Sequence, residues 1–209
     1  MIICERHRMV YLAPPKTGSV TVLRTLQEPP FHGETIGKRY DHHNTVWEER
    51  FRDWFFFTTV RHPYERMVSL WRFACKEIRT PEAPWRQGGN WWPRYFRGQA
   101  PSFEGFLNDR RLWRIFHNVW RCSWHIERIP RFVDEVIYME HFEELYRKVP
   151  GLQGVQARHE NPGPERTGPW WKYHTPATLR RTAEFWEEDF RMFGYNPNVE
   201  ECKRGEIFV

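Results

Sequence analysis

The sequence has few cysteines and no apolar run long enough to cross a membrane. Cys4, Cys75, Cys122 and Cys202 are scattered over the 209 residues, without a CxxC pair or a spacing typical of metal ligands. This use of cysteine is typical of reduced thiols in a cytoplasmic protein rather than of a disulfide framework or a zinc site. No stretch of about 18 apolar residues occurs, which excludes a membrane-spanning helix.

The amino terminus also lacks the pattern of a secretory signal. Charged residues at positions 5, 6 and 8 interrupt MIICERHRMVYLAPP before any long apolar segment can form. We therefore expect no signal peptide, no Golgi-type anchor and a cytoplasmic location.

The composition is that of a globular protein with a mild basic excess. Hydrophobic residues make up 40% and charged residues 28% of the chain, which does not favour disorder. The length suits a single domain spanning 1–209. The formal charge of +5 favours anionic ligands but does not choose among nucleotides, acidic glycans and nucleic acid.

Strand-like and helix-like segments alternate along the chain. Apolar residues 9–14 predict a buried strand, and 20–26 carry apolar residues at helical spacing. The segment WFFFTTV (54–60) is typical of a central strand, and 64–78 form an amphipathic helical pattern. A third strand is expected over 133–139, with helices over 142–149 and 177–193. This alternation predicts an α/β fold with a central parallel sheet flanked by helices.

Residues 79–103 break the alternation. The segment RTPEAPWRQGGNWWPRYFRGQAPSF is rich in proline, glycine, tryptophan and arginine, and too irregular for one long helix. We interpret it as an aromatic insertion packed over one face of the domain.

The first segment with chemical content is Pro15-Lys16-Thr17-Gly18-Ser19, between the first strand and its helix. A loop there directs backbone N–H groups along the helix axis, where the helix dipole favours an anion. Gly18 allows close approach, the hydroxyls of Thr17 and Ser19 add donors, and Lys16 adds a cation. The order differs from the GxxxxGK[ST] of P-loop NTPases, because Lys16 precedes the only glycine. Taken alone, the segment also fits an ordinary polar turn.

The second is RHPYERMVS, from Arg61 to Ser69. Arg61 follows the most strongly predicted strand, at the end where open α/β sheets bind ligands. Its guanidinium suits a phosphate, and Ser69 adds a hydroxyl two turns into the next helix. The alternative is an arginine that caps a strand and a serine packed within a helix.

Together these segments resemble the PAPS-dependent sulfotransferases, where PAPS is 3′-phosphoadenosine-5′-phosphosulfate. PKTGS resembles their 5′-phosphosulfate loop and VRHPYERMVSLW their 3′-phosphate motif. VDEVIYMEHFEELYR and LRRTAEFWEEDFRMFGY are similar to their later strand and terminal helix. The match is closest to the carbohydrate-type enzymes of the heparan 2-O-sulfotransferase-like group, and it covers most of the chain outside 79–130.

The resemblance implies a P-loop-like nucleotide-binding core that uses PAPS as donor, releases 3′,5′-adenosine bisphosphate (PAP) and needs no metal. It implies contacts to the 5′-phosphosulfate from one loop and the start of its helix: Lys16, Thr17, Gly18, Ser19, Val20 and Thr21. Lys16 would stabilise the charge on the leaving oxygen. Arg61 and Ser69 would hold the 3′-phosphate.

The resemblance also implies a base that accepts the proton of the acceptor hydroxyl. Related carbohydrate enzymes carry a histidine between their two phosphate motifs, often followed after one residue by threonine or serine. This pattern favours His43 in His43-Asn44-Thr45. His42 is the alternative histidine. Glu34, Glu48 and Glu49 are the alternative carboxylates.

Twelve tryptophans are the other unusual feature. Trp91 and Trp92 in the insertion could stack on an acceptor sugar, or could pin the loop by packing. Tyr173, or Lys172 beside it, falls in the zone where the family closes over the adenine of the donor.

Two other functions compete with sulfuryl transfer from PAPS. A nucleotide or small-molecule kinase would also bury phosphates in a strand–loop–helix, but would need a Walker lysine and a magnesium-holding aspartate. A basic aromatic nucleic-acid-binding module would explain the charge and the tryptophans, but not the two ordered phosphate motifs. We expect a saccharide or another hydroxyl compound as acceptor and no nucleic-acid partner; the oligomeric state stays open.

Overall fold

The computed structural model describes residues 1–36, 43, 45–80, 91–112, 121–155 and 168–209. The chain divides into two compact units, which are described separately. Unit 1 comprises Met1–His62 and Asn118–Thr167, and unit 2 comprises Pro63–His117 and Gly168–Val209.

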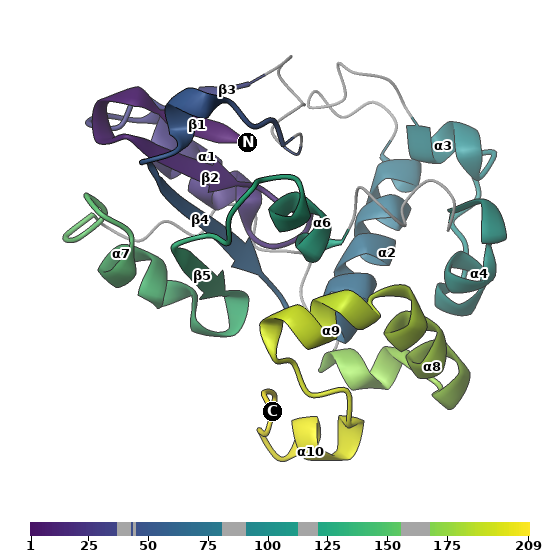
Figure 1. The fold of residues 1–209 in the computed structure, drawn as a ribbon. Helices are drawn as coiled ribbons and strands as arrows, with labels where there is room; N and C mark the ends of the chain where they lie inside the picture. Colours follow the sequence, from purple (N-terminus) through teal and green to yellow (C-terminus); the bar gives the residue numbers. More distant parts are fainter. Residues whose placement is uncertain (37–42, 44, 81–90, 113–120, 156–167) are drawn as a thin grey trace. The chain divides into compact units, whose positions relative to one another are not determined.

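Unit 1 is built on a sheet of five strands in the order β3-β1-β2-β4-β5 (Figure 1). Its strands are β1 (Ile2–Cys4), β2 (Met9–Leu12), β3 (Glu34–Thr35), β4 (Phe55–Val60) and β5 (Glu135–Tyr138). Its helices are η1 (Glu5–His7), α1 (Ser19–Gln27), η3 (Glu49–Phe51), α6 (Cys122–Glu127), η5 (Met139–Glu144) and α7 (Leu145–Lys148).

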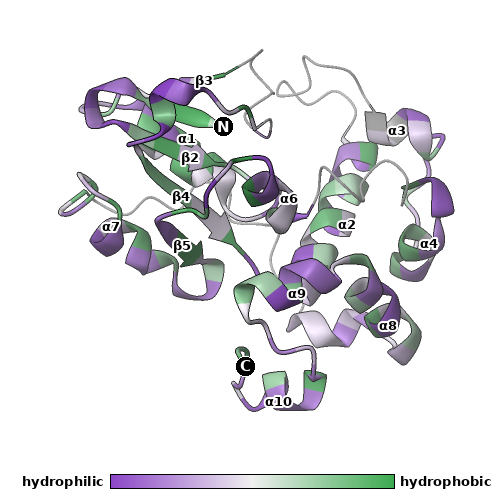
Figure 2. Cartoon of the chain, viewed as in Figure 1, coloured by the Kyte–Doolittle hydropathy of each residue, from purple (hydrophilic) through white to green (hydrophobic). Residues whose placement is uncertain are grey.

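The sheet is mixed rather than purely parallel. β2, β4 and β5 run parallel, as predicted, but β1 pairs antiparallel with both β2 and β3. The expectation of a central parallel sheet therefore holds for three strands, while the hairpin of β1 and β2 was not predicted. Burial explains the apolar runs: Figure 2 shows hydrophobic residues along β1 and β2, and β2 is buried throughout.

One face of the sheet forms a hydrophobic core with α1 and α7. Successive side chains of a strand point to opposite faces, so alternate residues of the strands enter this core. The strands contribute Ile2, Cys4, Met9, Tyr11, Phe57 and Ile137, and the helices contribute Val22, Leu26 and Leu145. This packing fixes the junction of β2 and α1, where the first predicted motif lies.

Unit 2 is helical in its described part. It contains α2 (Pro63–Arg79), α3 (Trp91–Tyr95), α4 (Phe103–Asn108), η6 (Trp170–Tyr173), α8 (Pro176–Phe185), α9 (Glu187–Phe193) and α10 (Val199–Lys203). The single helix expected over 177–193 is wrong in one respect. Trp186 leaves the helical conformation, with φ −123° and ψ 32°, and separates α8 from α9.

A buried ion pair joins α2 to α9. Arg66 Nη1 donates to Asp189 Oδ2 at 2.8 Å, and the side chains are only 1% and 3% exposed. The guanidinium carbon also lies 4.7 Å from the ring centroid of Trp186. The turn at Trp186 thus brings an aromatic face and a carboxylate to one buried cation.

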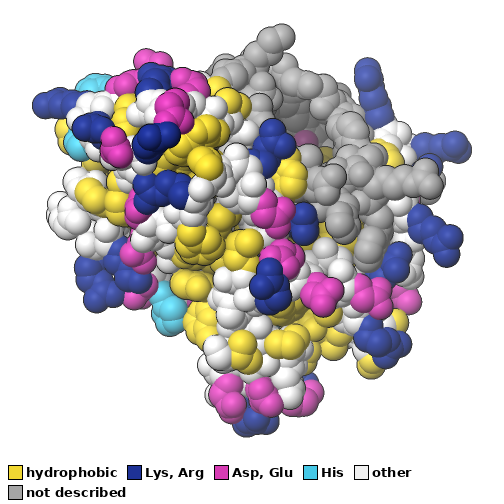
Figure 3. Space-filling view, viewed as in Figure 1, with side chains coloured by type: hydrophobic (Ala, Val, Ile, Leu, Met, Phe, Trp, Pro, Cys, Tyr) yellow, Lys and Arg dark blue, Asp and Glu magenta, His cyan; other side chains and the backbone are white. Residues whose placement is uncertain are grey.

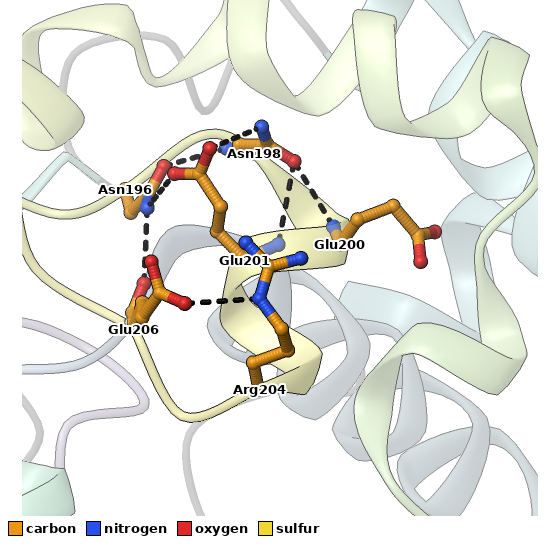
Figure 4. Close-up of polar contacts among 6 residues, drawn as sticks. All are labelled: Asn196, Asn198, Glu200, Glu201, Arg204 and Glu206. Carbon is orange, nitrogen blue, oxygen red and sulfur yellow. Dashed lines mark hydrogen bonds and ion pairs between the residues drawn. The ribbon is translucent and has the colours of Figure 1, made fainter.

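Polar side chains organise the carboxyl-terminal segment around α10 (Figure 4). Asn198 caps the helix by accepting from the amides of Glu200 and Glu201 at 3.1 and 3.4 Å. Asn196 donates to Glu201 Oε2 at 2.7 Å and to the carbonyl of Glu206 at 3.0 Å. The hydrogen bonds hold the ends of this segment together.

All four cysteines are buried free thiols, in agreement with their scatter along the sequence. Burial raises the pKa of Cys4 to about 12 and that of Cys202 to about 11, and it also raises the pKa of Cys75. None of the helices in the described part of the chain combines the length and apolar character needed to cross a membrane.

Candidate functional site

The loop between β2 and α1 has an uncommon backbone. Lys16 and Gly18 both have positive φ, +67° and +77°. A positive φ at a residue other than glycine is rare and concentrates at functional sites. At Gly18 a Cβ atom would lie 2.7 Å from Met139 Sδ. Glycine therefore suits both the positive φ and the small space beside Met139.

The start of α1 presents backbone amides, as the sequence predicted. Gly18 is the N-cap, and its carbonyl accepts from the amides of Thr21 and Val22 at 2.9 and 3.3 Å. The first amides of a helix have no acceptor within it. The amides of Ser19 and Val20 are therefore the ones that remain for an anion at this end, whereas the Thr21 amide already bonds Gly18.

A chain of buried hydroxyls supports the loop from below. Thr17 Oγ1 donates to the carbonyl of Pro14 at 2.8 Å, and Thr59 Oγ1 of β4 lies 2.9 Å from Thr17 Oγ1. Tyr11 Oη of β2 lies 2.5 Å from Thr59 Oγ1. Each hydroxyl has one proton, so the bonds run in one direction: Tyr11 donates to Thr59, and Thr59 donates to Thr17. Burial raises the pKa of Tyr11, which keeps its proton in place.

These hydroxyl–hydroxyl hydrogen bonds change the interpretation of Thr17. The sequence suggested that its hydroxyl donates to a phosphate, but its side chain is completely buried and its proton is already donated to Pro14. Thr17 can contribute its backbone to an anion site, and its side chain serves to shape the loop. The sequence analysis missed Tyr11 and Thr59; hydroxyls in the apolar strands 9–14 and 54–60 were the available signal.

His43 lies against the same loop. Its Nδ1 is 2.6 Å from the carbonyl oxygen of Ala13, three residues before Lys16. A carbonyl can only accept, so Nδ1 carries the proton and Nε2 is the basic nitrogen of the neutral ring. His43 and Ala13 are 30 residues apart in the sequence. Their hydrogen bond joins His43 to the segment that leads into the loop between β2 and α1, which we call the Lys16 loop.

The other candidate bases have different surroundings. His42 lies outside the described residues. Glu34 is exposed on β3, while Glu48 accepts from Arg50 Nε at 2.6 Å and Glu49 pairs with Arg52. Among the described residues, the carboxylates of Glu48 and Glu49 are thus engaged by arginines rather than by the loop between β2 and α1.

Arg61 leaves the sheet at the same edge as the Lys16 loop. β2 and β4 are parallel neighbours, and the carboxyl ends of parallel strands share one edge, where α/β sheets bind ligands. Arg61 is half-buried just after β4. The backbone amide of the next residue, His62, donates to Glu140 Oε1 at 2.8 Å. A carboxylate that follows β5 thus holds the backbone at the end of β4, which we call the Arg61 corner. Glu140 was not anticipated from the sequence.

Ser69 and Tyr173 belong to unit 2. Ser69 lies on α2 and is partly exposed. Tyr173 ends η6, with its ring centroid 5.9 Å from that of Trp71 and 6.0 Å from the guanidinium carbon of Arg72. Their expected contacts with the 3′-phosphate and the adenine remain predictions.

The described part of the aromatic insertion packs internally. Trp92 is 6% exposed, and its ring centroid lies 6.1 Å from that of Phe96 and 5.7 Å from that of Phe106. Trp92 therefore pins the segment by packing, which is one of the two interpretations above. Residues 81–90, with Trp85 and Arg86, lie outside the described residues.

Unit 1 also has an open hollow of about 630 Å³. It is lined by Trp47, Glu49, Arg52, Glu127, Arg128, Ile129, Pro130 and Arg131. On the face drawn in Figure 3, many basic side chains lie next to acidic ones. No group of three or more potential metal ligands occurs among the residues that the structure describes.

The comparisons with known proteins agree with this geometry. The sequence profile described as "Sulfotransferase family" matches residues 1–196. Neither the curated proteins nor the solved structures gave a match. The family match covers β2, the Lys16 loop, the Arg61 corner and the helices through α9. The Lys16 loop and Arg61 follow two neighbouring parallel strands, and His43 bonds Ala13 just before that loop. With this match over most of its length, the chain belongs to the sulfotransferase family.

Proposed function

We propose that this sulfotransferase takes its sulfuryl group from PAPS and transfers it to a hydroxyl of a saccharide or glycoconjugate. The observation that carries the proposal is the 2.6 Å hydrogen bond between His43 Nδ1 and the carbonyl of Ala13. It ties a histidine with a basic Nε2 to the loop that holds Lys16. A base and a cation beside one anion-binding loop are what this transfer needs.

Each residue then has a defined task. The amides of Ser19 and Val20 hold the 5′-phosphate, with Gly18 allowing close approach, and Arg61 with Ser69 holds the 3′-phosphate. PAPS, when bound, supplies an activated sulfuryl group. His43 Nε2 accepts the proton of the acceptor hydroxyl as its oxygen bonds to sulfur. Lys16 stabilises the negative charge on the bridging oxygen as its bond to sulfur breaks.

The finer assignments belong to the same proposal. The single-domain organisation over 1–209, a P-loop-like core, membership of the heparan 2-O-sulfotransferase-like group and a cytoplasmic location are proposed on the sequence pattern. The buried, reduced cysteines fit that location. Tyr173 is proposed to contact the adenine.

Labelled PAPS tests the function directly. Transfer of ³⁵S is measured to a panel of desulfated glycosaminoglycan oligosaccharides, neutral glycosides and small alcohols. We expect Lys16→Ala to lower the rate about 10²–10³-fold, the size typical of a lost transition-state donor. Lys203→Ala is the control, because Lys203 pairs with Glu200 on α10. A chain stabilised against heat by ATP–Mg²⁺ but not by PAP would instead be a kinase.

A second variant separates the base from its packing. In His43→Asn the amide group can still donate to the Ala13 carbonyl, but no basic nitrogen remains. We expect His43→Asn and His43→Ala to lower kcat about 10²–10⁴-fold with PAP affinity retained. Full activity in His43→Asn would exclude His43 as the base.

A further inference from the structure

Thr45, two residues after His43, contacts a side chain far along the sequence. Thr45 is 1% exposed, and its Oγ1 lies 2.8 Å from Nδ1 of His125 on α6. His125 is completely buried. Eighty residues separate the partners, so this contact is a product of tertiary folding.

A second contact holds the backbone of the same residue. Arg128, the C-cap of α6, donates from Nε to the carbonyl oxygen of Thr45 at 3.3 Å. Its guanidinium carbon lies 4.6 Å from the ring centroid of Trp124, also on α6. The side chain and the carbonyl of Thr45 are thus both held by one helix and its cap.

His43 and Thr45 are hydrogen-bonded to two different parts of unit 1. His43 bonds the chain at Ala13, where β2 leads into the Lys16 loop, and Thr45 bonds α6. The bond of His43 to Ala13 and the bond of Thr45 to α6 therefore both restrict where the ring of His43 can lie. A displacement of about 1 Å at a reacting group can lower a rate by about 10²-fold.

We propose that His125 is a positioning residue for His43 and acts through the hydroxyl of Thr45. This inference rests on the proposed function, because it takes His43 as the base. The contribution of His125 is to hold the backbone two residues away from the base.

The principal variant is Thr45→Val, which removes the hydroxyl and keeps the shape. We expect kcat to fall about 10–100-fold, while the affinity for PAP and the KM for PAPS stay within about twofold. Thr45→Ser retains the hydroxyl and should retain at least half of the activity. Thr182→Val is the matched control, because Thr182 is a buried threonine whose hydroxyl bonds within α8.

A second pair of variants probes the histidine. The amide of His125→Asn reaches the position of Nδ1 and can replace the bond to Thr45, whereas His125→Leu cannot. We expect the asparagine variant to be the more active of the two at equal thermal stability. If His125→Leu does not fold, the comparison of His125→Asn with Thr45→Val still tests the contact.

The deciding measurement is a double-mutant cycle with the ³⁵S-PAPS assay and the best acceptor of the panel. In a His43→Ala background, Thr45→Val should cause no further loss, because there is no base left to position. A folded Thr45→Val variant with unchanged kcat would overturn the proposal. So would a 10–100-fold loss that persists without His43, since Thr45 would then act elsewhere. If His43→Ala alone leaves kcat unchanged, the base assignment of the proposed function is what fails, and the positioning role falls with it.

Discussion

Thr17, in the loop after β2, and Thr59, near the end of β4, share a hydrogen bond of 2.9 Å between their hydroxyl oxygens. The bond joins the two chain segments whose ends carry Lys16 and Arg61. Because Thr59 in turn accepts from Tyr11, a single buried hydroxyl chain ties both proposed anion contacts to the sheet.

Tyr11→Phe removes the first donor of this chain. We expect a loss of about 1–2 kcal/mol in the free energy of unfolding, because the Thr59 oxygen is left buried without its donor. We also expect PAP to bind severalfold more weakly, because the Lys16 loop loses part of its hydrogen-bonded support. Urea unfolding and isothermal titration with PAP measure the two effects.

Tyr95→Phe is the matched control for Tyr11→Phe. Tyr95 Oη donates to Asp109 Oδ1 at 2.8 Å in unit 2. Its loss should change stability without changing the affinity for PAP. Equal PAP affinities in all three proteins would contradict a role of the hydroxyl chain in the loop.

Gly18→Ala tests the backbone of the loop itself. Alanine at φ +77° costs about 1 kcal/mol, and its Cβ must displace Met139. Gly154→Ala is a suitable comparison, because Gly154 has φ +80° and no described atom within 4 Å of its Cβ position. We expect Gly18→Ala to lose more stability than Gly154→Ala, because only its Cβ must displace Met139, and we expect only Gly18→Ala to lose PAP affinity. Unaltered binding by Gly18→Ala would show that the loop does not need its glycine.

Asp189→Asn breaks the buried ion pair of unit 2. Arg66 would then lose a buried carboxylate partner, and such a loss typically costs about 3–5 kcal/mol. The neighbouring Glu188→Gln weakens an ion pair with Arg191, whose side chain is 73% exposed, and should cost less than about 1 kcal/mol. Denaturant unfolding of the two variants measures the difference, and equal losses would contradict it.

His174 makes unit 2 sensitive to acid. Burial lowers the pKa of His174 from 6.5 to about 4, and its Nε2 donates to the carbonyl of Tyr64 at 3.2 Å. Below pH 6.5 the unfolded chain takes up a proton that the folded protein refuses, so stability falls as the pH drops from 6.5 towards 4. The full effect is about 3 kcal/mol.

A His174→Gln variant removes this titration. Its free energy of unfolding should vary less between pH 7 and 4.5 than that of the parent protein, as followed by urea unfolding at each pH. The same slope in both proteins would show that another group dominates the acid response.

Much of the chain order followed from local patterns, and the misses have local causes. The strands at 9–14 and 54–60 and their helices were predictable, because apolar runs and helical spacing lie within one segment. β1 has only three residues and precedes charged Glu5, Arg6 and Arg8, so nothing marked it as part of a hairpin. The break at Trp186 follows from tertiary packing on Arg66, which helical periodicity does not encode.

Some features of the candidate site were likewise predictable from the sequence, and others were not. Lys16, Gly18 and Arg61 could be singled out because motif order and strand ends are local properties of the sequence. The bond from His43 to Ala13 and the contact of Thr45 with His125 span 30 and 80 residues. No spacing rule predicts such contacts, and Thr17 was misread because its partner, Thr59, lies on another strand.

The burial of all four cysteines has a practical consequence for site-specific labelling. Thiol reagents attack the thiolate at an accessible sulfur, and these sulfurs are buried, three of them with a raised pKa. A cysteine introduced at an exposed position, such as Arg24 on α1, would therefore react selectively in the native protein. A fluorophore attached there would report on the helix that begins at the Lys16 loop, without prior removal of the natural thiols.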